Sequence, residues 1–294
     1  MKKRITGIFS NPLRRWFWLF LGPVTAAFAI GFVWPFIQGI YLSFCKFKLI
    51  KNATFIGFGN YISALSDASF RHSFWYTALF AVTSLVLINV LGFAAAYALT
   101  QGIKGSNLYR TVFFMPNLIG GIILGYIWHQ IFDGLLRSLD MPSLVTNETL
   151  GFWGLVILMC WQQAGYMMII YIAGFQSVPA DLYEAAKIDG ANKGQLLTNV
   201  TLPMMMPSIT ICSFLTLTNS FKLFDQNLAL TGGAPLVDGV WTTRMMALNI
   251  YKTFYGEGKA AKGAGQAEGV IFFLIVVVIS LVQLFLTRRK EVQA

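Results

Sequence analysis

The sequence predicts an all-α integral membrane protein with six transmembrane helices, and three observations support this fold class. The chain has 294 residues, of which 56% are hydrophobic and only 12% are charged, whereas a soluble domain carries about 25% charged residues. The apolar residues gather in six runs long enough to cross a bilayer. A charged segment of helix-forming residues, 178–203, interrupts these runs near the middle of the chain.

A spanning helix needs about 20 apolar residues, because each residue adds about 1.5 Å across a hydrocarbon core of about 30 Å. The first run holds Pro23 and Pro35, which can bend its helix or end it early. It is also too long for a secretory signal and has no clear cleavage site, so we interpret it as a retained span. The six runs are residues 16–44, 74–99, 111–132, 153–177, 205–230 and 269–287.

The remaining segments complete the domain organisation around a core of five spans, residues 74–287. Residues 1–15 form a basic N-terminus, and residues 288–294 form a short tail. Residues 45–73 form an outer loop, in which FIGFGNYISALSD is amphipathic and predicts a helix lying along the membrane interface. Residues 256–269, rich in Gly, Ala and Lys, predict a flexible outer loop. His129, at the outer end of the third run, is interpreted as an interface residue.

The basic residues indicate how the chain is oriented. The net charge is +10, and basic clusters lie before the first run and after the last one. Six spans place both termini on one side, and the positive-inside rule makes that side the cytoplasm. Segment 178–203 then also faces the cytoplasm. We therefore expect a multi-pass protein in the plasma membrane of a prokaryote, surrounded by lipid, with no nucleic-acid partner.

Segment 178–203 has the pattern of two short helices joined by a fixed turn. Pro179 and Asp181 predict the start of the first helix, and Gly190 predicts a left-handed residue at its end. A second helix over about 192–201 is expected to be broken at Pro203. One face of the first helix is mostly small, which allows close approach of another surface: Leu182, Ala185, Ala186 and Asp189. A helix resting on lipid is the alternative, but it would favour Lys, Trp and Leu.

The same segment resembles the EAA motif of permease subunits from ATP-binding-cassette (ABC) importers. It reads EAAKIDGA, then nine residues, then TLP. Leu197 and Val200 depart from the family pattern, which often has Phe and Ile there, but both remain apolar. The matching positions are Glu184, Ala185, Ala186, Asp189, Gly190, Ala191, Leu202 and Pro203.

The resemblance extends over nearly the whole chain. RTVFFMPNLIGGIILGYIWHQIF is similar to the third span of carbohydrate-importing permeases, and YIAGFQSVPADLYEAAKIDGA is similar to their approach to the EAA motif. LALTGGAP, residues 228–235, resembles their LTxGGP signature, with Ala234 in place of a usual Gly. Together these stretches resemble the MalF-type branch of the carbohydrate uptake family in a six-span form. The resemblance implies a type I ABC importer permease with a cytoplasmic coupling helix.

In that family the EAA loop docks into a cleft on a cytoplasmic ATPase, and closure of two ATPase copies switches the spans between inward-open and outward-open states. The resemblance implies that Glu184 pairs with a basic residue of the ATPase and that Ala185 and Ala186 permit close packing. It implies that Gly190 forms an elbow and that Leu202 and Pro203 fix the join to the fifth span.

The resemblance also implies the partners. They are two copies of the ATPase, which would hold ATP and Mg²⁺, a second permease of the MalG type and an extracytoplasmic solute-binding protein. This chain shows no GxxxxGK[ST] phosphate-binding pattern. We therefore expect a transport subunit that is not an enzyme and carries no cofactor of its own.

Polar residues within spans usually face a cavity or the interior of the bundle. By alignment with the family, a set of residues on the fourth and fifth runs resembles positions that line the sugar site in the middle of the membrane. Hydrogen bonding between helices is the alternative interpretation for each of them. The predicted substrate path is Gln163, Tyr166, Thr216, Asn219, Ser220 and Leu223.

The sequence leaves one alternative function open and disfavours two others. An ABC importer for a polyol or glycerol phosphate is the nearest alternative to a sugar importer. A secondary transporter should show carboxylates within its spans for ion coupling, and Asp225 is nearly alone there. His72 and His129 lie far apart without a nucleophile–base pattern, which disfavours a membrane enzyme. Cys45, Cys160 and Cys212 are widely spaced and predict neither a metal site nor disulfides.

Overall fold

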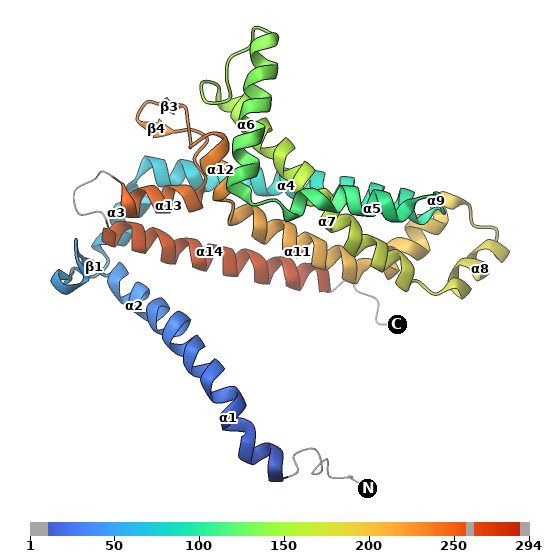
Figure 1. Ribbon diagram of the computed structural model, residues 1–294, viewed down its shortest axis with the longest axis horizontal. Helices are drawn as coiled ribbons and strands as arrows, with labels where there is room; N and C mark the ends of the chain where they lie inside the picture. Colours follow the sequence, from blue (N-terminus) through green and yellow to red (C-terminus); the bar gives the residue numbers. More distant parts are fainter. Residues whose placement is uncertain (1–10, 257–261, 289–294) are drawn as a thin grey trace.

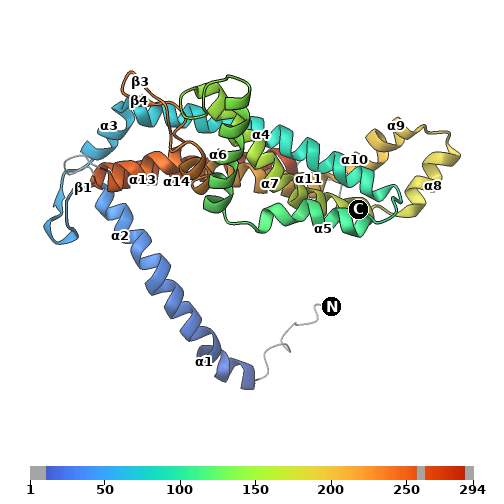
Figure 2. The same ribbon diagram turned by 45° about the horizontal axis from the view of Figure 1, so that its top comes forward.

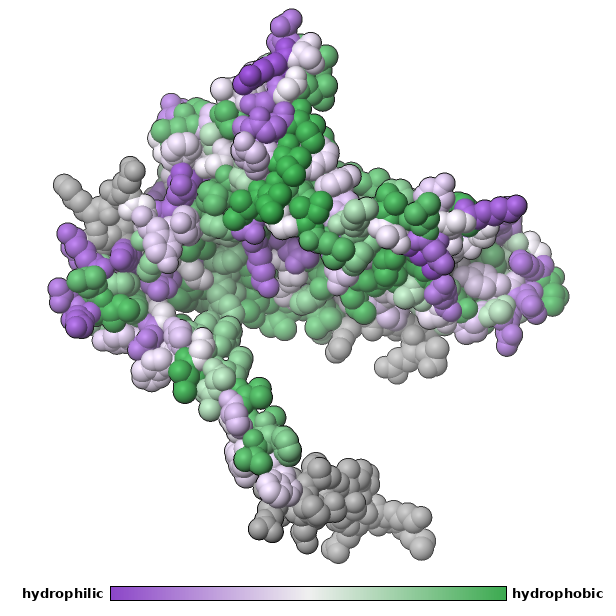
Figure 3. Space-filling model, viewed as in Figure 1, coloured by the Kyte–Doolittle hydropathy of each residue, from purple (hydrophilic) through white to green (hydrophobic). Residues whose placement is uncertain are grey.

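The computed structural model describes residues 11–256 and 262–288 (Figure 1). Four of its helices are long and apolar enough to span a membrane, and six spans result if each of two bent helix pairs is counted as one. In Figure 3, apolar residues cover the middle of the visible face, and hydrophilic residues gather toward the ends of the bundle and on the projecting α6 (Gly121–Ser138). The predicted all-α membrane fold is confirmed.

The centre of the bundle consists of three helices, α4 (Ala68–Thr100), α7 (Glu148–Ser177) and α11 (Met206–Phe221). Both long helices begin at a side-chain cap. Asp67 accepts a hydrogen bond from the Ser69 N–H at 2.7 Å, and Asn147 accepts one from the Leu150 N–H at 3.0 Å. These caps satisfy N–H groups that a helix start leaves free. They also explain why the helices begin before the predicted residues 74 and 153, in polar sequence that hydropathy does not detect.

The first run forms one long helical arm. Helix α1 (Asn11–Phe28) continues through a π-helical stretch (Ala29–Val33) into α2 (Trp34–Ser43). Neither Pro23 nor Pro35 ends the helix; at Pro35 the π-helical stretch just before it changes the hydrogen-bond spacing. Within this arm, α2 packs against the last helix, α14 (Lys262–Arg288), whereas α1 extends away from the bundle in both views (Figure 2).

The outer segment that follows contains a short hairpin of β1 (Cys45–Lys46) and β2 (Thr54–Phe55), with a 3₁₀ turn (Ile50–Asn52) between them. Helix α3 (Gly59–Ser66) then forms within the predicted interfacial stretch and exposes Ile62 and Leu65. Buried Asn60 ties this helix to the hairpin by donating to the carbonyls of Ser43 and Cys45.

The third run, 111–132, is not one straight span, which corrects the prediction. Helix α5 (Ser106–Phe114) continues into a 3₁₀ turn (Met115–Leu118), and the chain then bends by 100° into α6. Pro116 lies at the start of the 3₁₀ turn, and Gly120 is extended at φ −60°, ψ 138°. Hydropathy averaged over a window reports only that both halves are apolar, so it predicts a single span across the bend.

The fifth run, 205–230, is also divided. Helix α11 ends at Phe221, and a separate helix α12 (Asp225–Leu230) follows, because Phe224 adopts φ −122°, ψ −59°. Helix α12 packs on α6. The sixth run begins earlier than predicted, since α14 already includes residues 262–269 of the expected flexible loop. The rest of that loop, residues 257–261, lies outside the described residues, as do residues 1–10 and 289–294.

Candidate functional site

The EAA segment lies at one end of the molecule (Figure 1). In the chain it connects α7 to α11, two of the three central helices. Its first helix, α8 (Ala180–Ile188), begins after Pro179 and carries Asp181 in its first turn, where a negative charge suits the helix dipole. Glu184 and Ala185 are exposed, Ala186 is half-buried, and Ile188 is 85% exposed. Helix α8 therefore presents small and apolar side chains to the outside of this chain.

Gly190 ends α8 in the predicted left-handed conformation, with φ +82°. Its N–H donates to the Lys187 carbonyl at 3.1 Å, and the Ala191 N–H donates to the Ala186 carbonyl at 2.9 Å. This pair of bonds is the Schellman pattern, which satisfies carbonyls that a helix end leaves free. The exposed Asp189 caps the helix at φ −70°. The turn after α8 is thus fixed by backbone bonds.

The second helix begins at a capping box that the sequence analysis missed. The Asn192 side chain accepts from the Gln195 N–H, and the Gln195 side chain accepts from the Asn192 N–H, both at 2.9 Å. The Asn-x-x-Gln spacing is the signal that could have identified it. Helix α9 (Lys193–Gln195), a π-helical turn (Leu196–Thr201) and α10 (Leu202–Met204) then run on continuously.

Pro203 does not break this second helix, which corrects the prediction. It lies in the first turn of α10, directly after the π-helical turn, where its missing N–H is tolerated. The chain instead bends by 69° between Met204 and Met206, where α11 begins with Pro207 in its first turn. Leu202 and Pro203 are half-buried at this join.

Behind the two short helices lies a cavity of about 430 Å³ that separates them from the ends of α4 and α7. Thr201 Oγ1 donates to the Tyr183 hydroxyl at 3.3 Å and so links the second helix to α8. Tyr183 and Thr201 also line the cavity and were not identified from the sequence. The segment is therefore held internally as one unit, with space between it and the central helices.

The predicted substrate-path residues of the fifth run lie on α11 or, for Leu223, just after its end, among packed helices. Thr216 is fully buried, and its Oγ1 accepts a hydrogen bond from Asn89 Nδ2 of α4 at 3.2 Å. Ser220, also fully buried, donates to the Thr216 carbonyl at 2.8 Å. Leu223 is 4% exposed, whereas Asn219 is only half-buried. Thr216 therefore takes part in the interhelical hydrogen bonding that was the alternative interpretation.

The two predicted residues on α7 are placed differently. Gln163 is buried, and its Oε1 has no hydrogen-bond partner among the residues that the structure describes. Tyr166 is half-buried, with its ring 6.3 Å from the ring of Phe114. Among the described residues, no hydrogen bond joins Gln163 or Tyr166 to the α11 set. The neighbouring Gln162, in contrast, is satisfied by Gln226 and the Ile119 carbonyl.

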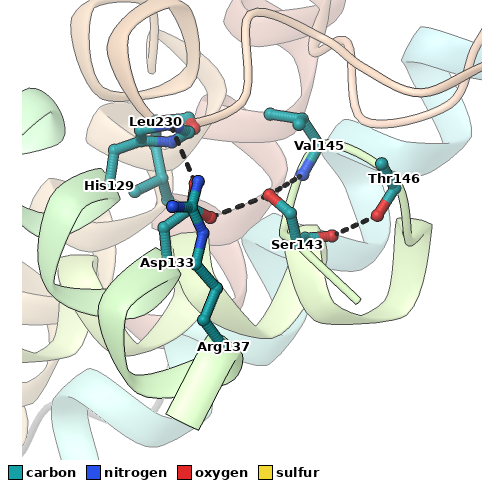
Figure 4. A network of polar contacts seen from close by, with 7 residues as sticks. All are labelled: His129, Asp133, Arg137, Ser143, Val145, Thr146 and Leu230. Atoms are coloured by element: carbon teal, nitrogen blue, oxygen red, sulfur yellow. Dashed lines mark hydrogen bonds and ion pairs between the residues drawn. The ribbon is translucent and has the colours of Figure 1, made fainter. Parts of the chain in front are cut away.

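His129, which the sequence predicted to be an interface residue, makes polar contacts within the chain in the structure. Its Nδ1 lies 2.7 Å from the Leu230 carbonyl of α12, and its Nε2 lies 3.6 Å from Asp133 (Figure 4). Asp133 also accepts from the Ser143 hydroxyl at 2.7 Å. This polar network fastens α6 to α12 and to the loop before α7. Asp133 directly follows the third run, and Ser143 lies in the loop before α7.

Comparison with known proteins shows one family. The family model described as binding-protein-dependent transport system inner membrane component matches residues 88–292. A starch degradation products transport system permease protein from Thermoanaerobacterium thermosulfurigenes is 46% identical over 97% of each chain. A multiple sugar-binding transport system permease protein from Streptococcus mutans is 31% identical, over 94% of this chain and 97% of its own.

One solved structure with a similar fold is a bacterial ABC transporter involved in the import of the acidic polysaccharide alginate. The TM-score is 0.79 at 21% identity, over 95% of this chain and 98% of that one. This similarity supports the type I permease fold.

Proposed function

The chain belongs to the family of binding-protein-dependent transport system inner membrane components, and we propose that it is the permease subunit of an ATP-driven importer of a sugar or oligosaccharide. It is a transport component and not an enzyme. The sugar class is supported by the two permease relatives, which are named for starch degradation products and for multiple sugars.

The observation that carries this proposal is the rigid, exposed segment α8–α10 between α7 and α11. A partner that moves α8 would also move α7 and α11, the two helices joined to the segment, because Gly190 and the capping box fix the turn inside it. The partner we propose is a cytoplasmic ABC ATPase, present in two copies that bind ATP with Mg²⁺. A second permease of the MalG type and an extracytoplasmic solute-binding protein complete the assembly.

Within the segment, Ala185 and Ala186 offer a surface that a cleft on the ATPase can approach closely. Glu184 is exposed for pairing with a basic residue of the ATPase, a contact that contributes little by itself because surface ion pairs are worth about 0–1 kcal/mol. Asp189, Gly190 and Ala191 form the elbow. Leu202 and Pro203 join the segment to α11. We further propose that α8 faces the cytoplasm and that both termini lie on the same side as α8.

For the substrate path, we propose that Gln163, Tyr166 and Asn219 contact sugar more directly than Thr216, Ser220 and Leu223. The free Oε1 of Gln163 supports this order, because buried polar atoms are normally hydrogen-bonded. Thr216, Ser220 and Leu223 are buried within this chain. They would support the wall of the path from behind.

The experiment that tests the proposal is purification of the tagged chain from its host with its partners, followed by reconstitution into vesicles. ATP inside the vesicles and a loaded solute-binding protein outside should drive uptake of radiolabelled maltooligosaccharide. A panel containing a polyol and glycerol 3-phosphate identifies the solute class. Uptake without ATP, or stable isolation of the chain alone, would contradict the importer assignment.

A further inference from the structure

A hollow of about 490 Å³ opens at the end of the molecule opposite α8. Its lining residues come from the end of a hairpin of β3 (Leu236–Val237) and β4 (Val240–Trp241) and from helix α13 (Met246–Tyr255). Figure 1 shows these elements at the end of the molecule away from α8. In the proposed orientation this end faces the outside of the cell. The hollow, called here the outer pocket, is lined by Trp241, Arg244, Tyr251, Lys252, Tyr255 and Gly256.

Arg244 is held in the outer pocket by the LTGGA turn. Asn227 is fully buried; its side chain donates to the Thr243 carbonyl at 2.8 Å and accepts from the Met245 N–H at 3.0 Å. One amide therefore fixes both residues that flank Arg244. Gly233, at φ +91°, lies against the arginine side chain, and a Cβ there would come within 3.0 Å of it. The turn thus leaves room for Arg244 and sets its direction.

Arg244 has no anionic partner within the described part of the chain. Its guanidinium lies 4.7 Å from the centre of the Trp241 ring, and its Nε is buried without a hydrogen-bond partner. Neither Arg244 nor Lys252 forms an ion pair among residues 11–256 and 262–288. The Glu268 carboxylate instead accepts from Asn249 and Thr253, each at 3.2 Å. Burial lowers the pKa of Arg244, and the Glu268 charge acts in the opposite direction.

A partly buried cation is unfavourable unless it is paired. The Glu268 charge and the Trp241 ring stabilise Arg244, but no carboxylate among the described residues forms an ion pair with its guanidinium. The outer pocket carries two cations and no carboxylate among its lining residues, and its Tyr251 and Tyr255 hydroxyls can donate or accept. A carboxylate matches this excess of positive charge and suits the fork of an arginine, whereas a neutral sugar leaves the two charges unpaired. Trp, Tyr and Arg are also the residues that dominate the binding energy of protein interfaces.

We propose that the outer pocket anchors the extracytoplasmic solute-binding protein by receiving one Asp or Glu side chain from it between Arg244 and Lys252. The inference rests on the proposed function, which supplies the partner. Tyr251 stacks edge-on against Phe224 at 5.2 Å, and Phe224 follows Leu223 of the predicted substrate path. The anchor would therefore hold the loaded protein next to the outer end of that path.

The test uses the complete importer reconstituted in vesicles with its own solute-binding protein. ATPase rate is measured against the concentration of that protein, at low and high salt. We expect Arg244→Gln to raise the half-saturating concentration about ten-fold with the maximal rate retained, and Lys252→Gln to raise it about three-fold. Arg244→Lys should restore part of the loss. Lys51→Gln, which removes a cation from the outer loop away from the pocket, should stay within about two-fold.

Half-saturation unchanged in both pocket variants would overturn the proposal. If Arg244→Gln does not assemble, Lys252→Gln on the exposed face of α13 decides alone. If Glu257→Gln raised the half-saturating concentration as much as the pocket variants do, the proposal would also be overturned, because the carboxylate would then come from this chain. A shift that depends on which saccharide is loaded would point to sugar binding instead. Failure of the proposed function looks different, since the wild-type importer would show neither uptake nor stimulated ATPase activity.

Discussion

The backbone N–H of Ala191 donates to the carbonyl of Ala186 at 2.9 Å and thereby closes the end of α8 around Gly190. This bond makes the direction of the chain after α8 a property of the backbone. Tyr183 of α8 is bonded to Thr201, whereas the exposed side chains of Glu184, Ala185 and Ile188 remain available to contact a partner.

The elbow should be more sensitive to substitution than the charge beside it. In Gly190→Pro the ring fixes φ near −65°, which conflicts with +82°, and removes the N–H that bonds Lys187. We expect ATP-driven uptake to fall below about one tenth of wild type, with loss of copurifying ATPase. Glu184→Ala removes only an exposed charge and should retain more than about a third of the uptake. Equal uptake by the two variants would refute this ranking.

Bulk on the small face of α8 should block docking without unfolding the chain. Ala185→Trp places a large ring on an exposed position and leaves the packed core of this chain unchanged. We expect a wild-type melting temperature and loss of the ATPase from the purified complex. Ala180→Trp, exposed on a different side of the same helix, is the matched control and should keep the ATPase. Retention of the ATPase by Ala185→Trp would show that docking uses another surface.

Buried polar residues on α7 and α11 should separate into structural and transport roles. Thr216→Val removes a bond to Asn89 of a kind worth about 0.6 kcal/mol in membrane proteins, so it should leave the KM for uptake nearly unchanged. Gln163→Leu and Asn219→Leu should each raise that KM several-fold, because each loses a proposed hydrogen bond to the sugar that is worth about 1 kcal/mol of binding free energy. Uptake kinetics and melting temperature measured on the same preparations distinguish the roles. A KM effect confined to Thr216→Val would reverse the proposed order.

The capping box should control the start of the second helix. Asn192→Ala removes the acceptor for the Gln195 N–H and should cost about 1 kcal/mol of local helix stability. Hydrogen exchange of the amides of residues 193–196 should accelerate about five-fold, while exchange in α7 stays unchanged. Asn192→Ser, which can still cap, serves as control. Unchanged exchange in the alanine variant would mean that packing alone holds this turn.

The sequence predicted the class of fold and the elbow better than the shape of the spans. Gly190 was predictable because a left-handed residue is needed where the helical pattern stops before a second helix. The bends near Gly120 and Met205 were not, because hydropathy records composition and not direction. The placement of Thr216 was also inaccessible, since its partner Asn89 is 127 residues away in the chain. Arg244 was not identified from the sequence as a candidate binding residue, because its surroundings depend on the turn at Gly233 and on the hydrogen bonds of the buried Asn227.

The most direct test of the central claim is site-specific cross-linking between α8 and the ATPase. The native cysteines, Cys45, Cys160 and Cys212, are all buried, so an introduced Ala185→Cys offers an exposed thiol for a short maleimide cross-linker. The account predicts a covalent adduct of this chain with the ATPase in the purified complex. An adduct formed by Ala98→Cys on α4, with none from Ala185→Cys, would contradict it.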